Sequence, residues 1–170
     1  YRYKMVFEIL SAYYYLFDVQ IYYIYEQMFN IILTFAKISM MEEQILRSET
    51  RQFKAIFPNT LNANETLFGG QAMKWMDGVA YITATRFTRQ KMFTVNTENI
   101  YFLKTVHPNS IVEIVGKIEK AGAVKLRVKV EIYAEEMYGQ NREKVVESVF
   151  VFAALDDNMK PKRIDYSNIK

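Results

Sequence analysis

The strictest hydrophobic pattern in the chain lies in residues 123–136, AVKLRVKVEIYAEE, where apolar and polar side chains alternate. A period of two predicts a β-strand with one buried face. A shorter strand is predicted at residues 51–58, where a proline ends it. Three more strands are predicted for FTVNTENIYFL at 93–103, SIVEIVGKIEKAG at 110–122 and KVVESVFVFAALD at 144–156. The short links between them indicate antiparallel neighbours.

Residues 70–87 follow the helical period instead. At about 100° per residue, their apolar side chains fill a broad arc. Its members are Ala72, Met73, Trp75, Met76, Val79, Ala80, Ile82, Ala84 and Phe87. An arc of this width predicts a helix that is largely enclosed by other elements. Asp77 falls at the border of the arc, and a polar loop leads into the helix through Gly69 and Gly70.

A long helix followed by a run of antiparallel strands predicts an α+β domain at residues 41–170. In this arrangement a curved antiparallel sheet wraps around the long central helix, which is the hotdog fold. Hydrophobic residues make up 51% of the chain, so a single domain of this size has enough apolar side chains for a core.

Residues 1–40 differ from the rest, since they hold eight of the thirteen tyrosines and neither glycine nor proline. Charged residues such as Glu26 and Lys37 interrupt the apolar runs before a membrane span accumulates, and no signal-peptide pattern is present. Met40 and Met41 begin a segment that resembles the usual N-terminus of a protein. The favoured hypothesis is therefore that residues 1–39 are translated upstream sequence from an AT-rich genome. A membrane-surface helix and an additional packing helix are the alternatives.

The composition argues against several classes of function. The chain has no cysteine, which excludes disulfides and thiolate metal sites and fits a cytoplasmic protein. Its single histidine, His107, argues against a histidine-rich metal site and a Ser-His-Asp triad. With no cysteine and one histidine, we expect no bound metal. The net charge of +3 arises from scattered lysines and arginines, so we expect no nucleic-acid partner.

Several blocks of the chain resemble one enzyme family. FPNTLNANETLFGGQAMKWMDGVAYITATRF, residues 57–87, is similar to the signature loop and helix of the YciA and brain acyl-CoA hydrolase type. FTVNTENIYFLKTV, IVEIVGKIEKAG and VFVFAALDDNMKP resemble later family blocks in the same order. The resemblance covers roughly residues 48–165. It implies a hotdog thioesterase that hydrolyses acyl-CoA to a free carboxylic acid and CoA.

The resemblance also implies a homodimer with two helices side by side, commonly assembled further into a trimer of dimers. Asp77 of one chain is then the general base or nucleophile, and it faces Asn62 and the glycines of the other chain. Asn62 positions the water or the thioester, and the Gly70 amide forms the oxyanion hole. Expected substrate and CoA contacts are Phe68, Gly69, Thr94, Arg86, Lys120 and Gly122. No cofactor is expected, because CoA is part of the substrate.

Simpler interpretations of the same residues remain open. Asp77 fits an ion pair with Lys74 one turn away, and Asn62 fits an ordinary turn. A non-catalytic hotdog module that binds acyl-CoA is the alternative function. A third hypothesis is a lipid-metabolism protein docked to a membrane by its aromatic N-terminus, although we do not expect a membrane partner.

The chain departs from the family pattern at a few positions. Gly78 stands where glutamate is usual, Glu65 where glycine is common, and Thr105 where proline is common. Val124 and Lys125 replace a Thr-Ser pair that lies near CoA. The catalytic Asp and Asn are retained, so activity is still expected, whereas the changed turn is expected to alter the details of CoA binding.

Overall fold

A computed structural model describes residues 2–167, with side chains from residue 19 onward. Residue 1 and residues 168–170, at the outer ends of the two predicted segments, lie outside the described part. The chain divides into two compact units, Tyr1–Glu42 and Glu43–Lys170. Helix α1 (Arg2–Arg47) makes up most of the first unit, and its side chains from residue 19 to residue 40 are all exposed. In the described chain, no helix has the length and apolar character needed to cross a membrane.

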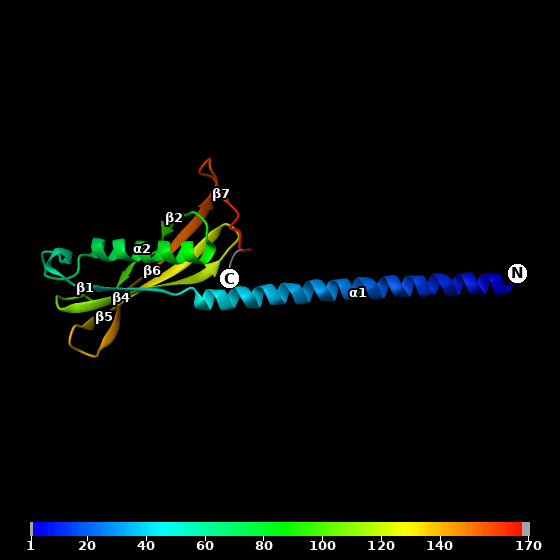
Figure 1. Cartoon of the computed structure of the whole chain (residues 1–170), viewed down its shortest axis with the longest axis horizontal. Helices are drawn as coiled ribbons and strands as arrows, with labels where there is room; N and C mark the ends of the chain where they lie inside the picture. The colour runs from blue at the N-terminus through cyan, green and yellow to red at the C-terminus, as the bar shows by residue number, and fades with distance from the viewer. Residues whose placement is uncertain (1, 168–170) are drawn as a thin grey trace. The chain divides into compact units, whose positions relative to one another are not determined.

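The second unit is built on an antiparallel sheet in which the strand order is β1-β4-β5-β6-β2, and two short strands, β3 and β7, also pair with β6. Helix α2 (Gly69–Thr88) lies along one face of this sheet (Figure 1). This arrangement confirms the predicted hotdog fold. The strands are β1 (Thr50–Ala55), β2 (Met92–Thr97), β3 (Tyr101–Phe102), β4 (Ser110–Ala121), β5 (Lys125–Glu136), β6 (Arg142–Leu155) and β7 (Pro161–Lys162).

The packing of α2 on the sheet depends on a glycine in β4. A Cβ atom at Gly116 would lie 2.6 Å from Thr83 Oγ1 and 2.9 Å from Val79 Cγ1, both on α2. The glycine therefore lets the helix approach the strand more closely than any other residue would allow. The buried side of α2 consists of Ala72, Met76, Val79, Ala80, Thr83, Ala84, Phe87 and Thr88.

The expectation that α2 is largely enclosed is wrong on one side. Met73 is 44% exposed and Tyr81 is 47% exposed, although both belong to the predicted apolar arc. They lie on an exposed strip that we call the open stripe, formed by Gly70, Met73, Lys74, Asp77, Gly78 and Tyr81. The apolar arc is wide because it includes both the side chains that cover the sheet and those that this chain leaves uncovered.

The predicted strand at residues 93–103 is interrupted. Its first part forms β2, the edge of the main strand order, and its last part forms β3. Both pair with β6, with Thr97 opposite Phe150 and Tyr101 opposite Glu147. The main sheet therefore ends at a short strand whose outer side has no neighbour in the described chain.

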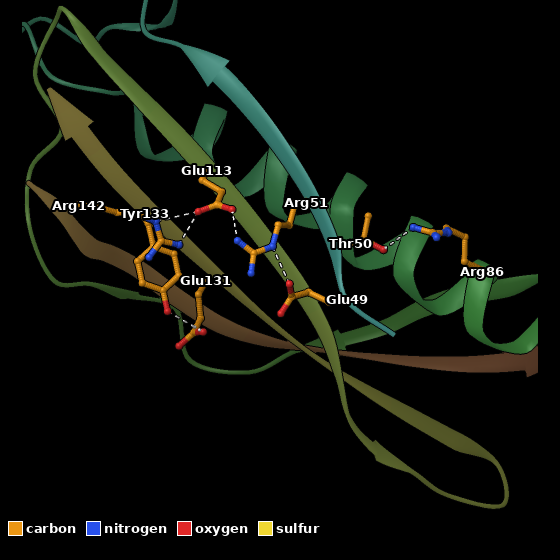
Figure 2. Close-up of polar contacts among 8 residues, drawn as sticks. All are labelled: Glu49, Thr50, Arg51, Arg86, Glu113, Glu131, Tyr133 and Arg142. Carbon is orange, nitrogen blue, oxygen red and sulfur yellow. Dashed lines mark hydrogen bonds and ion pairs between the residues drawn. The ribbon is translucent and has the colours of Figure 1, made fainter. Parts of the chain in front are cut away.

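The face of the sheet opposite α2 carries a charged network (Figure 2). Glu113 of β4 is only 7% exposed, and it accepts hydrogen bonds from Arg51 Nη1 at 2.6 Å and Arg142 Nε at 2.8 Å. Arg142 stacks on the Tyr133 ring, 3.6 Å from its centroid. Burial acts to raise the pKa of Glu113, but the hydrogen bonds and charges of the two arginines outweigh it and hold that pKa below its ordinary value.

Candidate active site

The first turn of α2 presents two unpartnered backbone donors. The helix begins after Phe68, which is extended and provides no side-chain cap. The amides of Gln71 and Ala72 donate to the Phe68 carbonyl, whereas those of Gly69 and Gly70 donate to no acceptor in the described chain. A Cβ on Gly70 would lie 2.5 Å from the Phe68 ring, so glycine lets this ring fold over the turn. Two free N–H groups at the positive end of a helix dipole suit a developing oxyanion.

Asn62 organises the loop that leads into α2. Its Oδ1 accepts hydrogen bonds from the amides of Asn64 at 2.9 Å and Thr66 at 3.2 Å, while its Nδ2 donates to Thr66 Oγ1 at 3.0 Å. The turn interpretation is therefore correct for this side chain. An amide nitrogen carries two hydrogens, so one remains available to a ligand while the loop fixes the group in place.

Glu65, in the same loop, explains one departure from the family pattern. Its φ of 55° lies in the left-handed region that disfavours residues with a Cβ atom. Glycine adopts this conformation without a steric penalty. This backbone conformation explains why glycine is common at this position in the family. The backbone of Glu65 is strained, and glycine would relieve that strain.

Asp77 and Thr94 lie together in the structure. Thr94 Oγ1 donates a hydrogen bond to Asp77 Oδ1 at 3.2 Å, and both residues are exposed. Thr94 is opposite the helix-facing Phe152 in the β2–β6 ladder, which places it on the α2 side of the sheet. No ion pair joins Asp77 to Lys74 among the described residues, so that interpretation is wrong. The other oxygen of Asp77 makes no hydrogen bond to a described residue.

The other predicted CoA contacts lie at the opposite end of α2. Arg86, in its last turn, donates to Thr50 Oγ1 at 3.3 Å (Figure 2). The Gly122 turn is joined to the C-terminal segment by Tyr166, whose hydroxyl donates to the Gly122 carbonyl at 2.6 Å, and Lys120 lies exposed just before it. Burial raises the pKa of Tyr166 to about 12.

Distances along α2 decide which candidates one chain brings together. At about 1.5 Å per residue, Gly70 and Asp77 are separated by roughly 10 Å, and Gly70 and Arg86 by roughly 24 Å. A thioester carbonyl held at Gly70 is therefore out of reach of Asp77 on the same helix. Asp77 forms a hydrogen bond with Thr94, and Asn62 lines the same cavity as Gly69 at the start of α2. Within one chain, the carboxylate of Asp77 is therefore separate from Asn62 and the free amides.

A cavity of about 390 Å³ opens beside the start of α2. We call it the loop cavity; its lining includes Asn62, Leu67 and Gly69 from the loop and the start of α2, together with Phe102, Leu103 and Val106 from β3 and the segment after it. Phe102, Leu103 and Val106 were not among the predicted site residues, although all three lie in the block FTVNTENIYFLKTV, which resembles the family. Among the described residues, no cluster of His, Asp and Glu side chains is placed to hold a metal ion.

Comparison with known proteins places the chain in a family. A family model described as the thioesterase superfamily matches residues 64–139. Over 109 residues, the chain is 31% identical to the acyl-CoA thioester hydrolase YciA of Salmonella typhimurium, covering 62% of this chain and 81% of that protein. The chain belongs to the thioesterase superfamily. Within it, the chain is also 32% identical over 106 residues to the uncharacterized acyl-CoA thioester hydrolase YkhA of Bacillus subtilis, and it spans only 62% of that relative's length.

Solved structures of thioesterases share the fold. An acyl-CoA hydrolase from Staphylococcus aureus, in complex with butyryl coenzyme A, coenzyme A and coenzyme A disulfide, superposes with a TM-score of 0.66 at 29% identity, covering 71% of this chain and 73% of that one. A hexameric thioesterase from Yersinia pestis superposes with a TM-score of 0.61 at 27% identity, covering 67% of this chain and 93% of that one.

Alanine variants of the Staphylococcus aureus hydrolase have also been solved. They replace an asparagine, an aspartate and a threonine. The intervals between these positions, 15 and 17 residues, equal those from Asn62 to Asp77 and from Asp77 to Thr94.

Proposed function

We propose that this chain hydrolyses acyl-CoA thioesters to a carboxylic acid and CoA. The observation that carries the proposal is the arrangement along α2. An exposed carboxylate, Asp77, is oriented by Thr94 and lies about two turns from two free amides at Gly69 and Gly70. These are a proton acceptor and an oxyanion site, which thioester hydrolysis requires.

The site is completed by a second copy of the chain. The open stripe is exposed along α2, and Gly78 within it has no neighbouring atom within 4 Å of the position of a Cβ. Two such helices side by side and antiparallel bring Asp77 of one chain to Asn62 and the glycines of the other. The unpaired outer side of β2 offers a further surface for self-association. We further expect three such dimers to assemble as a trimer of dimers, and solved relatives that are described as hexameric support an assembly of this size.

Each group has one task in this site. The thioester carbonyl oxygen accepts a hydrogen bond from the Gly70 amide, with Gly69 and Phe68 against the substrate. The second Nδ2 hydrogen of Asn62 holds the thioester or the attacking water. Asp77 either takes a proton from that water or attacks the carbonyl carbon to form an anhydride that water then cleaves. In both routes the C–S bond breaks and CoA leaves as its thiolate, which takes up a proton.

CoA itself extends away from the reacting carbon. Arg86, Lys120 and the Gly122 turn lie at the far end of α2, where their charges and backbone suit the phosphates and the adenosine. The length of α2, about 30 Å, matches an elongated substrate. No separate cofactor enters this scheme.

The relatives support the proposal in two ways. Those named above are acyl-CoA thioester hydrolases, and one structure contains butyryl coenzyme A. The variants solved for that hydrolase have the same residue types at the same intervals as Asn62, Asp77 and Thr94.

The test is product analysis with the full-length chain. Purified protein is incubated with a series of acyl-CoAs in large excess, and free acid and CoA are quantified by mass spectrometry. The proposal predicts many product molecules per chain for at least one acyl group. Tight acyl-CoA binding with no product would contradict it and would support the alternative, a non-catalytic binding module.

A further inference from the structure

The loop cavity has apolar inner walls. Ala72, Val106 and Val146, which line it, are 1%, 5% and 2% exposed, respectively. Ala72 belongs to the buried side of α2, and Val146 belongs to the helix-facing side of β6. The cavity therefore reaches from the loop toward the core of the domain, and its deeper part has no side chain that would bind a charged group.

Phe102 forms one wall of the cavity at its mouth. It is opposite Val146 in the β3–β6 ladder, and its ring Cζ lies 3.3 Å from the position of a Cβ on Gly69. The ring thus lies so close to the turn with the free amides that a side chain at Gly69 would crowd it. At 55% exposed, it is not part of the core, so its size is free to vary without a loss of packing.

The charges around the cavity argue against the CoA phosphates as its occupant. Lys104 is the only cationic side chain among the described residues that line it. Its ammonium is paired with Glu143. The cavity therefore offers a neutral, largely apolar space directly beside the expected position of the thioester carbonyl.

We propose that the loop cavity receives the acyl chain of the substrate, and that Phe102 sets the longest chain that fits. This inference rests on the proposed function for the identity of the ligand. With about 390 Å³ of space and roughly 30 Å³ for a water-sized group, the cavity holds an acyl chain of about thirteen carbons. Longer chains leave their ends outside and gain nothing further from the cavity.

The test measures binding separately from turnover. Thioether analogues of acyl-CoA cannot be hydrolysed, so their affinities for the wild-type protein are measured by titration calorimetry, with acyl groups from acetyl to octadecanoyl. Each added methylene that enters an apolar cavity is expected to tighten binding about threefold to fourfold. The affinity then reaches a plateau at about thirteen carbons, the length derived above from the cavity volume.

Two variants of Phe102 move the plateau in opposite directions. Phe102→Ala widens the cavity and shifts the plateau to longer chains, and Phe102→Trp shifts it to shorter ones. Phe53→Ala is the matched control, because Phe53 is 62% exposed on β1 and lies outside the cavity lining. This control leaves the plateau where it was.

The outcomes separate the two proposals. Turnover by the wild type, together with a plateau that both Phe102 variants leave unchanged, would overturn the acyl-cavity inference and keep the proposed function. No turnover on any acyl-CoA, together with a plateau that shifts as expected, would overturn hydrolysis and support an acyl-binding cavity. An affinity that does not depend on chain length contradicts the inference in either case.

Discussion

Two inactive variants of this protein should restore activity when they are combined in one dimer. Asp77→Ala removes the carboxylate from the middle of α2, and Asn62→Ala removes the amide near its start. Because Gly70 and Asp77 on one helix are about 10 Å apart, each site takes its carboxylate from one chain and its loop from the other. A mixed dimer then has one site with both defects and one site with neither.

The expected size of the effect follows from the two-fold symmetry of the dimer. Random assortment of equal amounts makes half of the dimers mixed, and each mixed dimer has one intact site of two, so the mixture recovers about a quarter of wild-type activity. Each variant alone is expected to lose on the order of a hundredfold or more in kcat. The recovered activity is therefore far above the background of either variant.

The assay is thiol release from acyl-CoA after the two variants are unfolded together in urea and refolded. The control is the same mixture made without unfolding, in which the subunits have not exchanged. Size-exclusion chromatography confirms that the refolded material has the oligomeric state of the wild type. Activity that stays at the background of the single variants would refute a site shared between chains and would place Asp77 and Asn62 of one chain in the same site.

Three further predictions concern stability, measured by urea unfolding. Glu65→Gly relieves a left-handed backbone position and should raise the free energy of unfolding by a few tenths to about 1 kcal/mol; an unchanged or lower midpoint would contradict the strain. Gly116→Ala places a Cβ 2.6 Å from Thr83 Oγ1 and should cost about 1–3 kcal/mol, and a neutral result would mean that α2 moves freely on β4. Glu113 has a pKa below the ordinary 4.5 when folded, so its stabilising contribution is complete above that pH and is lost as the pH falls through the folded value. Glu113→Gln should therefore lower stability at neutral pH and lose less stability than the wild type on acidification, and parallel pH curves would argue against the arginine pairing.

The regular strands and the helix were predictable because the spacing of apolar residues along the sequence reflects which side chains are buried. The alternation at residues 123–136 identified β5, and the apolar arc at residues 70–87 identified α2 within one residue at each end. These features depend on local periodicity, which the order of residue types records directly. The arc predicted Asp77 at its border, whereas the structure places this residue within the exposed open stripe, because Met73 and Tyr81 beside it are also exposed.

Contacts between distant segments were not predictable in the same way. The hydrogen bond from Thr94 to Asp77 depends on the register of β2 on β6, which local patterns do not record. The left-handed backbone at Glu65 was hidden because its residue type is typical of other conformations. Likewise, the nearly buried Glu113 occupies a position that alternation assigns to solvent, since its arginine partners lie on two other strands.

The most direct test of the central claim is the rate of thiol release by Asp77→Asn, which keeps the shape of the side chain and removes its charge. Lys74→Gln is the matched control, because Lys74 lies one turn away on the same open stripe of α2 and has no role in the proposed chemistry. The proposal predicts that Asp77→Asn lowers kcat by about a hundredfold or more while Lys74→Gln stays close to the wild type. Equal rates for Asp77→Asn and the wild type, with the fold intact, would contradict the assignment of Asp77 as the catalytic carboxylate.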